Sequence, residues 1–300
     1  MYNVAVMKKI MAKYGLFVGL VTLDLIYLAD APPSSNQKIV AQETTIAAGG
    51  PATNAAIAFQ HLGNSATLIG AIGSHPICHL IHADLRACGV HTIDLAPTKT
   101  ESPPVSSIVV TQSTGDRAVV SLNAVRSQIE PVCIPQNILN QIDVVLIDGH
   151  QTAIGATIAR MAHDRNIPVV IDAGSWKPGF ETVFPWVSYA ICSANFHPPT
   201  VQPVFDYLQN FGISHIAITQ GKNAITFTCA GGSELPNLKI DVPQVPVIDT
   251  LGAGDIYHGA FCHFILEHDF TTALSKAANV AAHSCQFFGT REWMKHRPYN

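Results

Sequence analysis

Short continuous apolar runs alternate with segments of helical apolar spacing along most of the chain. Gly15–Leu23 and Ala66–Gly73 are the first two such runs, and each predicts a strand buried on both faces. From residue 134 the alternation is regular, and it predicts helices at 137–141, 152–164 and 201–211 and strands at 144–147, 169–171, 187–191, 215–219 and 224–228. The pattern predicts one α/β domain over residues 1–300, with a central, mostly parallel sheet and helices on both faces.

A second group of strand-like segments has a more exposed pattern. Residues 38–46 alternate β-branched and polar side chains, and residues 104–111 and 117–122 form a hairpin around a glycine-containing loop. We expect these segments, from about 37–48 and 105–123, to form a small sheet that stands off the main domain. Further helices are predicted at 77–87 and 271–288, and no linker or internal repeat divides the chain.

The content of charged residues and of cysteine limits the kinds of partner and the cellular compartment to expect. Only 13% of the residues are charged, against roughly 25% in an average globular protein, which favours a large core and a subunit interface. A formal net charge of −4 gives no reason to expect nucleic acid or a membrane surface as a partner. The seven cysteines are scattered without a Cys-x-x-Cys pair, which indicates reduced thiols in the cytoplasm. His75, His79 and His82 could share one face of the helix predicted at 77–87, but Pro76 makes its first turn, and no metal site is predicted.

The N-terminal segment has some features of a secretory signal. Lys8, Lys9 and Lys13 precede an apolar run over residues 16–29. However, Asp24 interrupts this run, which is too short to span a bilayer. A buried first strand explains the run equally well, so secretion is not predicted.

The stretch Asp249-Thr-Leu-Gly-Ala-Gly-Asp255 carries the clearest chemistry. An extended segment leads in, Gly252, Ala253 and Gly254 make a turn, and helical spacing follows over residues 256–266. Free amides at the start of such a helix form an anion site. A carboxylate at its mouth suits a base that takes a proton from a hydroxyl attacking a bound phosphoryl group. The alternative is that Asp255 only caps the helix and the glycines only make the turn.

Other polar residues stand where strands or loops meet helices. Thr22 and Asp24 end the first apolar run, and a carboxylate can accept hydrogen bonds from two vicinal hydroxyls. Gly49 and Gly50 precede an apolar helix that begins near Asn54. The alternatives are a loop aspartate or helix cap at 24 and an ordinary loop at 49–54. The carboxyl ends of the predicted parallel strands, where ligands bind in such sheets, carry Asp148, Asp172, Asn195, Thr219 and Gly221.

The run 249–255 resembles the C-terminal signature of the ribokinase-like (PfkB) carbohydrate kinases. Residues 19–24 and 49–54 resemble the N-terminal patterns of the same family, and the resemblance extends over about residues 15–290. It implies a ribokinase-like fold in which the small sheet is a lid over the sugar. It also implies that the amides of Gly252, Ala253 and Gly254 form the anion hole and that Asp255 is the catalytic base. The residues implied on the sugar side are Thr22, Asp24, Gly49, Gly50, Asn54 and Arg117, although Arg117 can equally be a plain surface residue.

The resemblance also implies a nucleotide side, with ATP, Mg²⁺ and a monovalent cation such as K⁺. Thr219 and Gly221 match a Thr-x-Gly turn beside the nucleotide. Asn195 matches the start of an Asn-x-x-Glu motif, but Pro198 replaces the glutamate, which puts the handling of magnesium in doubt. Asn279 and Ala282 lie on the alanine-rich last helix, which flanks the adenine in the family; the alternative is a helix that is only tightly packed.

The implied function is transfer of the γ-phosphoryl group of ATP to a hydroxyl of a small sugar by a cytoplasmic homodimer joined through the lid. The N-terminal and 249–255 motifs look most like those of ketohexokinases, and Gly-Gly-Pro-Ala and His-Gly-Ala look like portions of bacterial sulfofructose kinases. A fructose-type ketose is therefore the expected acceptor. The alternatives are an adenosine-type nucleoside kinase and a catalytically weak sugar-binding regulator.

Overall fold

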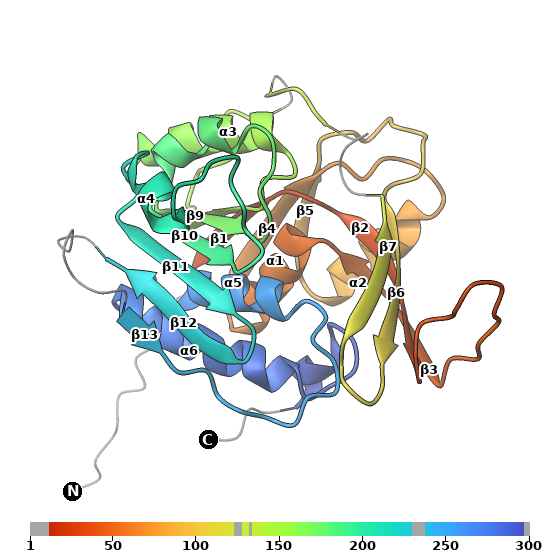
Figure 1. Cartoon of the computed structure of the whole chain (residues 1–300). Helices are drawn as coiled ribbons and strands as arrows, with labels where there is room; N and C mark the ends of the chain where they lie inside the picture. Colours follow the sequence, from red (N-terminus) through yellow and green to blue (C-terminus); the bar gives the residue numbers. More distant parts are fainter. Residues whose placement is uncertain (1–11, 123–127, 132–133, 230–237, 297–300) are drawn as a thin grey trace, which may run out of the picture.

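Two β-sheets of different size organise the chain, as the computed structural model shows (Figure 1). The structure describes residues 12–122, 128–131, 134–229 and 238–296. Within these residues the larger sheet has nine strands and the smaller sheet has four. The smaller sheet lies beside the larger one, so a ligand can bind between the two.

The larger sheet is mostly parallel. Its spatial order is β13 (Leu238–Ile240), β12 (Asn223–Thr228), β11 (His215–Gln220), β10 (Tyr189–Ser193), β9 (Val169–Ala173), β8 (Val144–Ile147), β1 (Tyr14–Val18), β4 (Ser65–Gly70) and β5 (His91–Asp94). Every neighbouring pair from β11 to β5 is parallel, and β12 and β13 add an antiparallel edge. The carboxyl ends of the parallel strands therefore meet at one edge of the sheet, which is where such sheets bind ligands.

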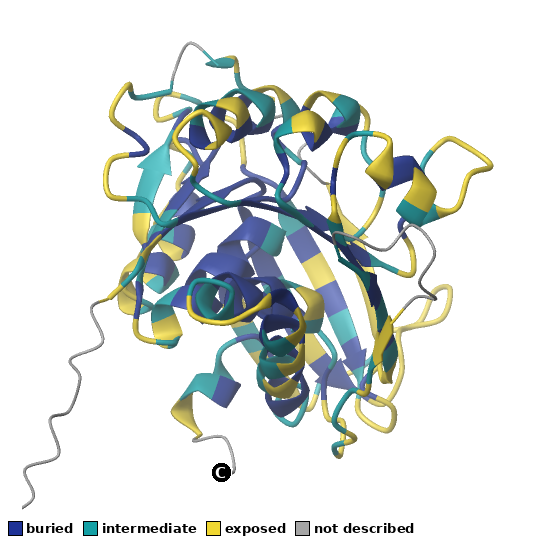
Figure 2. Ribbon diagram, turned by 90° about the vertical axis from the view of Figure 1, so that its left-hand side faces the viewer, coloured by how far each residue is buried: buried dark blue, intermediate teal, exposed yellow. Residues whose placement is uncertain are grey.

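Helices cover both faces of this sheet, as predicted. They are α1 (Pro51–His61), α2 (Cys78–Ala87), α3 (Thr152–His163), α4 (Val204–Gln209), α5 (Ala253–Phe264) and α6 (Phe270–Ser284), with 3₁₀ turns at Phe180–Thr182, Phe184–Trp186 and Glu292–Lys295. Along β1, Phe17 packs into the cluster that contains α1, α2, α5 and α6, whereas Leu16 and Val18 pack into the cluster of α3 and α4. Figure 2 shows the buried strands as a layer between these two groups of helices.

The helix predicted at 137–141 is wrong, because residues 136–141 form consecutive turns instead. Their amides bond three residues back, as from Ile138 to Pro135, and Gln141 has a φ of 65°. Five residues are too few to nucleate a stable helix, and a left-handed residue ends the segment.

The single first strand predicted over 15–23 is also wrong. β1 ends at Val18, and the chain crosses at Gly19–Val21 into β2 (Thr22–Ala29), which belongs to the smaller sheet. A side chain at Gly19 would overlap the buried carboxylate of Asp148, and the amide of Leu20 donates to that carboxylate at 2.8 Å. Asp24 consequently lies inside a strand of the smaller sheet rather than at the end of the core strand.

The smaller sheet, called the lid sheet below, confirms the predicted small sheet. Its order is β3 (Glu43–Gly49), β2, β6 (Val105–Thr111) and β7 (Arg117–Ser121). β2 was not predicted as a member, residues 37–42 are not strand, and residue 123 lies outside the described residues. Ile26, Ile108 and Val110 of one lid face pack near Leu251, just ahead of α5. This packing holds the lid sheet against the start of α5.

The close packing of α1 on α5 predicts that position 259 tolerates only glycine. A side chain there would overlap the carbonyl oxygen of Ala55 in α1. We expect Gly259→Ala to lower the free energy of unfolding by about 1–3 kcal/mol through overpacking, despite the higher helix propensity of alanine. Gly254→Ala is the control on the same helix, since a side chain there meets no atom within 4 Å. Equal urea midpoints for the two variants would contradict this packing argument.

Candidate active site

A cavity of about 370 Å³ lies between the lid sheet and the carboxyl ends of the parallel strands. Three parts of the chain line it. They are the inner lid face (Thr22, Asp24, Ser106, Ile108, Arg117, Val119, Ser121), the strand ends (His150, Asp172, Gly174, Ser193, Asn195, Thr219) and the segments around the starts of α1 and α5 (Leu20, Gly50, Pro51, Asn54, Leu251, Gly252, Gly254, Asp255, His258). Most residues predicted from separate motifs therefore meet in one cavity.

The start of α5 presents free amides to this cavity. Gly252 precedes the helix with a φ of 71°, a left-handed conformation that glycine adopts without strain. Among the described residues, no acceptor lies within hydrogen-bond range of the amides of Gly252, Gly254 and Asp255. The amide of Ala253 instead donates to the Thr250 carbonyl at 3.3 Å. The start of α5 thus has three free amides beside the cavity, as an anion site requires, and anion binding there stays a prediction.

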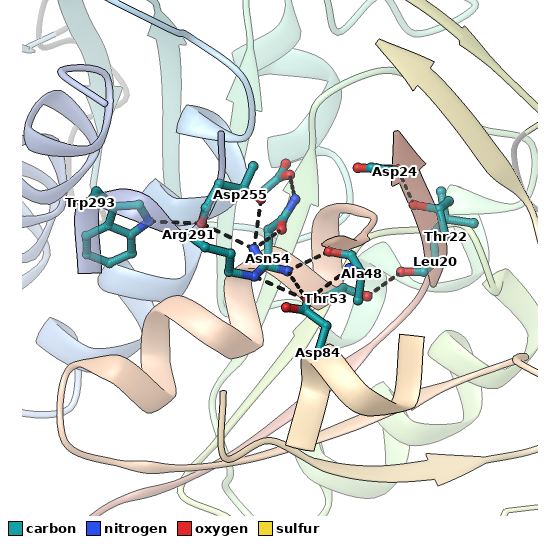
Figure 3. Close-up of polar contacts among 11 residues, drawn as sticks. Leu20, Thr22, Asp24, Ala48, Thr53, Asn54, Asp84, Asp255, Arg291 and Trp293 are labelled. Carbon is teal, nitrogen blue, oxygen red and sulfur yellow. Dashed lines mark hydrogen bonds and ion pairs between the residues drawn. The ribbon is translucent and has the colours of Figure 1, made fainter. Parts of the chain in front are cut away.

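Asp255 lies in the first turn of α5, next to these amides. Its Oδ2 accepts a hydrogen bond of 2.9 Å from Nδ2 of Asn54, which comes from α1 (Figure 3). Burial, followed by the negative charge of Asp172, raises the pKa of Asp255 to about 7, against the opposing hydrogen bond from Asn54. A carboxyl group with this pKa can exchange a proton near neutral pH.

His258 connects the first turn of α5 to the strand ends. Its Nδ1 lies 2.7 Å from the carbonyl oxygen of Gly254 and 3.4 Å from Oδ2 of Asp172. Its Nε2 lies 3.2 Å from the carbonyl oxygen of Ile191 in β10. The sequence analysis gave His258 no role, although a histidine three residues after Asp255 shares its side of the helix.

Asp24 lies on the lid side of the cavity. It is buried and accepts a hydrogen bond of 2.7 Å from the Thr22 hydroxyl, and burial raises its pKa. A side chain at Gly49 would overlap this carboxylate, and Gly50, with a φ of 104°, lies against the Leu20 carbonyl. Both positions therefore require glycine, because a side chain would overlap Asp24 or the Leu20 carbonyl. The absence of side chains lets the end of β3 and the start of α1 lie next to Asp24.

Arg117 extends from the start of β7 toward α5. Its Nη1 donates to both the carbonyl and the hydroxyl oxygen of Thr250, at 3.2 Å each. Thr250 precedes the turn at Gly252, so Arg117 lies on the α5 side of the cavity. The residue is exposed, yet it lines the cavity.

The predicted nucleotide-side residues divide into two groups. Asn195 and Thr219 line the cavity, and the Thr219 hydroxyl donates to the Cys192 carbonyl at 3.2 Å. Gly221 forms the turn between β11 and β12 with a φ of 59°, Asn279 is exposed on α6, and Ala282 is buried there. These last three residues do not line the cavity, and their role stays a prediction.

Over the described part of the chain, no group of three or more His, Cys, Asp or Glu side chains is arranged to hold a metal ion. Nor does any helix there have the length and apolar content to cross a membrane.

Arg291, like His258, had no role in the sequence analysis, although it contacts a residue that lines the cavity. It follows α6 and donates to Oδ1 of Asn54 at 3.0 Å and to Oδ2 of Asp84 at 3.0 Å (Figure 3). The sequence signal was small, because an arginine after Gly289-Thr290 near the end of the chain has no local pattern that links it to residue 54.

A large, mostly parallel sheet with helices on both faces and a small separate lid sheet defines a ribokinase-like fold. Residues 12–297 match the model of the pfkB family of carbohydrate kinases, and the chain belongs to this family. It is therefore a carbohydrate kinase.

The known proteins that are similar to this chain include sugar kinases, which is consistent with this family assignment. It is 25% identical over 290 residues to the ribokinase of Bacillus subtilis (strain 168), covering 93% of this chain and 95% of the relative. It is 25% identical over 259 residues to the fructosamine kinase FrlD of the same organism, covering 82% and 87%. The structure of Arabidopsis thaliana ribokinase complexed with ribose and ATP superposes with a TM-score of 0.75 at 18% identity, covering 96% of this chain and 100% of that one.

The charge of Asp172 makes a prediction about the pKa of Asp255. Removing a nearby like charge favours the ionised form, so Asp172→Asn should lower the pKa of Asp255 below about 7. The measurement is a ¹³C NMR titration of the Asp255 carboxyl carbon. Glu292→Gln, which removes an exposed carboxylate from the 3₁₀ turn Glu292–Lys295, is the control and should leave the titration unchanged. An unshifted titration in Asp172→Asn would refute the proposed coupling.

Proposed function

We propose that this chain transfers the γ-phosphoryl group of ATP to a hydroxyl of a small sugar, and that the sugar is a ketose of fructose type. One observation carries the proposal: a carboxyl group with a pKa of about 7, Asp255, lies beside free amides in the same cavity as the buried Asp24. The similar ribokinase and fructosamine kinase support a sugar or sugar derivative as acceptor.

In the proposed reaction the amides at the start of α5 bind the phosphoryl group. Asp255 accepts the proton of the attacking hydroxyl, while that hydroxyl oxygen bonds to phosphorus and ADP leaves. Asn54 occupies Oδ2 of Asp255, so Oδ1 is the oxygen available to the hydroxyl. Asp24 and Thr22 bind further hydroxyls of the acceptor. The Thr22 hydroxyl donates to Oδ1 of Asp24, and an ionised carboxylate has further acceptor sites for hydroxyls of the sugar.

The nucleotide is proposed to lie toward Asn195 and Thr219, at the strand ends on the far side of Asp255 from the lid. Magnesium carried by its phosphates would neutralise charge there, and it generally needs only one or two protein carboxylates. Asp172 is a strand-end carboxylate that would suit it, since it is buried and lines the cavity, while Pro198 offers no ligand. A monovalent cation such as K⁺ and a cytoplasmic location belong to the proposal through the family resemblance alone.

A panel of sugars and nucleosides assayed for ATP consumption tests this function. We expect turnover with a ketose, and Asp255→Asn should lower kcat about 10²–10⁴-fold because it removes the base. ATP binding and the fold should survive, since the substitution keeps the shape of the side chain and removes only the negative charge that faces the phosphates. Near-normal turnover in Asp255→Asn would show that Asp255 is not the base.

Other outcomes of the panel identify the alternatives. Turnover with nucleosides alone would indicate an adenosine-type nucleoside kinase. Sugar binding without turnover would indicate a sugar-binding regulator, the reading that Pro198 favours.

The lid sheet leads to a proposal about assembly. Tyr27, Ile46 and Val120 are exposed and share, by strand register, the lid face that points away from the cavity. An apolar sheet face with open edges favours association. We propose a homodimer that buries this face.

Light scattering provides the test of the dimer. We expect a mass of about twice the 32.1 kDa chain at micromolar concentration. Val120→Lys should shift the mass toward the monomer because it places a charge in the buried face. Val201→Lys is the control, since Val201 is fully exposed in the loop before α4. A wild-type protein that stays monomeric would exclude this assembly.

A further inference from the structure

The guanidinium group of Arg291 joins four separate parts of the chain (Figure 3). Nη1 donates to Oδ1 of Asn54 at 3.0 Å and to the Thr290 hydroxyl at 2.9 Å. Nε and Nη2 donate to Oδ2 of Asp84 at 3.3 and 3.0 Å, and Nη2 also donates to the carbonyl of Ala48. The side chain is only 16% exposed, so these bonds form away from bulk water.

This arrangement fixes the orientation of the Asn54 carboxamide. A guanidinium group only donates hydrogen bonds, so the oxygen of Asn54 must face Arg291. The amino group then faces Oδ2 of Asp255, at 2.9 Å. A flipped carboxamide would set its amino group against the guanidinium and its oxygen against the carboxylate, and both contacts would be repulsive.

The same guanidinium group holds the end of the lid sheet. Ala48 is in β3, pairs with Leu23 of β2 and immediately precedes Gly49. Its carbonyl accepts from Arg291, and its amide donates to Oδ2 of Asp84 at 2.9 Å. Asp84 and Arg291 therefore bind the amide and the carbonyl group of the same lid-strand residue, Ala48.

We propose that Arg291 is a positioning residue that holds the Asn54 amino group toward Asp255 and ties this arrangement to the lid sheet at Ala48. The inference rests on the proposed function, because it gives Asp255 the role of base. Arg291 itself does not line the cavity, so it acts through Asn54.

Replacement by lysine separates geometry from charge. An ammonium group keeps the positive charge but lacks the planar fork that reaches Asn54, Asp84 and Ala48 together. In Arg291→Lys the Asn54 carboxamide is free to turn, and Asp255 loses a donor that stabilises its ionised form. We expect the pKa of Asp255 to rise in a ¹³C NMR titration. We also expect kcat at pH 7 to fall about 10–100-fold, the size of a lost hydrogen bond to a charged group, with the acidic limb of the kcat profile moved to higher pH.

A double-mutant cycle tests the route through Asn54. Asn54→Ala removes the link, so adding Arg291→Lys to it should change the pKa of Asp255 little further. Lys295→Met is the control, because it removes an exposed cation of the neighbouring 3₁₀ turn that pairs with Glu292. An equal rise from Arg291→Lys with and without Asn54 would overturn the proposal, and so would an unchanged titration in Arg291→Lys alone.

A second variant keeps the test decisive if Arg291→Lys does not fold. Asp84→Ala removes the acceptor of Nε and Nη2 and frees Ala48, so the pKa of Asp255 should again rise. Loss of a negative charge by itself would lower that pKa, so the sign separates positioning from charge. A fall or no change would count against the positioning role.

The titration also separates this inference from the proposed function. If Asp255→Asn keeps normal turnover, Asp255 is not the base, yet the titration still reports whether Arg291 positions Asn54. If Asp255→Asn is inactive but Arg291→Lys titrates as wild type, only the present inference fails.

Discussion

The buried carboxylate of Asp148 is the interaction on which the site depends most. It is 1% exposed, and it accepts from the amides of Leu20 at 2.8 Å, Ala52 at 3.1 Å and His150 at 2.8 Å. A buried charge needs such partners, because leaving it without hydrogen bonds is costly. The three amides belong to the crossing from β1 to β2, to the first turn of α1 and to the segment after β8. One side chain therefore fixes where the chain leaves the core, and with it the positions of Asp24 and Asn54.

In the proposed function, Asp255 is a base next to amides that bind an anion, and its surroundings have opposite effects on its charge. The amides at the start of α5 and the helix dipole favour negative charge, whereas Asp172 and burial oppose ionisation of Asp255. Asn54 counteracts part of that effect with one hydrogen bond. The result is a carboxyl group that changes its protonation near neutral pH, which is the condition a general base requires.

The lid sheet has two faces with different chemistry because side chains alternate along each strand. Asp24, Ser106 and Ile108 face the cavity, and Tyr27, Ile46 and Val120 face away from it. The inner face lines the cavity, while the outer face carries exposed apolar side chains. Arg291 is bound to the end of the same sheet, so the position of the lid and the position of Asn54 are physically linked.

Local patterns in the sequence determined much of this protein. Strand β8 was predicted at its observed bounds because a short apolar run encodes a strand buried on both faces. The run 249–255 predicted a turn, a helix start and an anion site, because glycine, small residues and helix termini act over a few positions. These features required no knowledge of distant residues.

Tertiary structure decided the rest. Asn54 meets Asp255 across 201 positions and Arg291 across 237, and hydrogen bonds between such distant residues leave no periodicity in the sequence. The first apolar run divides between two sheets at Gly19–Val21, where Asp148, far along the chain, accepts a hydrogen bond from the amide of Leu20. Sequence therefore determined most of the elements and the local geometry of the main motif, while long-range packing and hydrogen bonding decided which side chains contact Asp255.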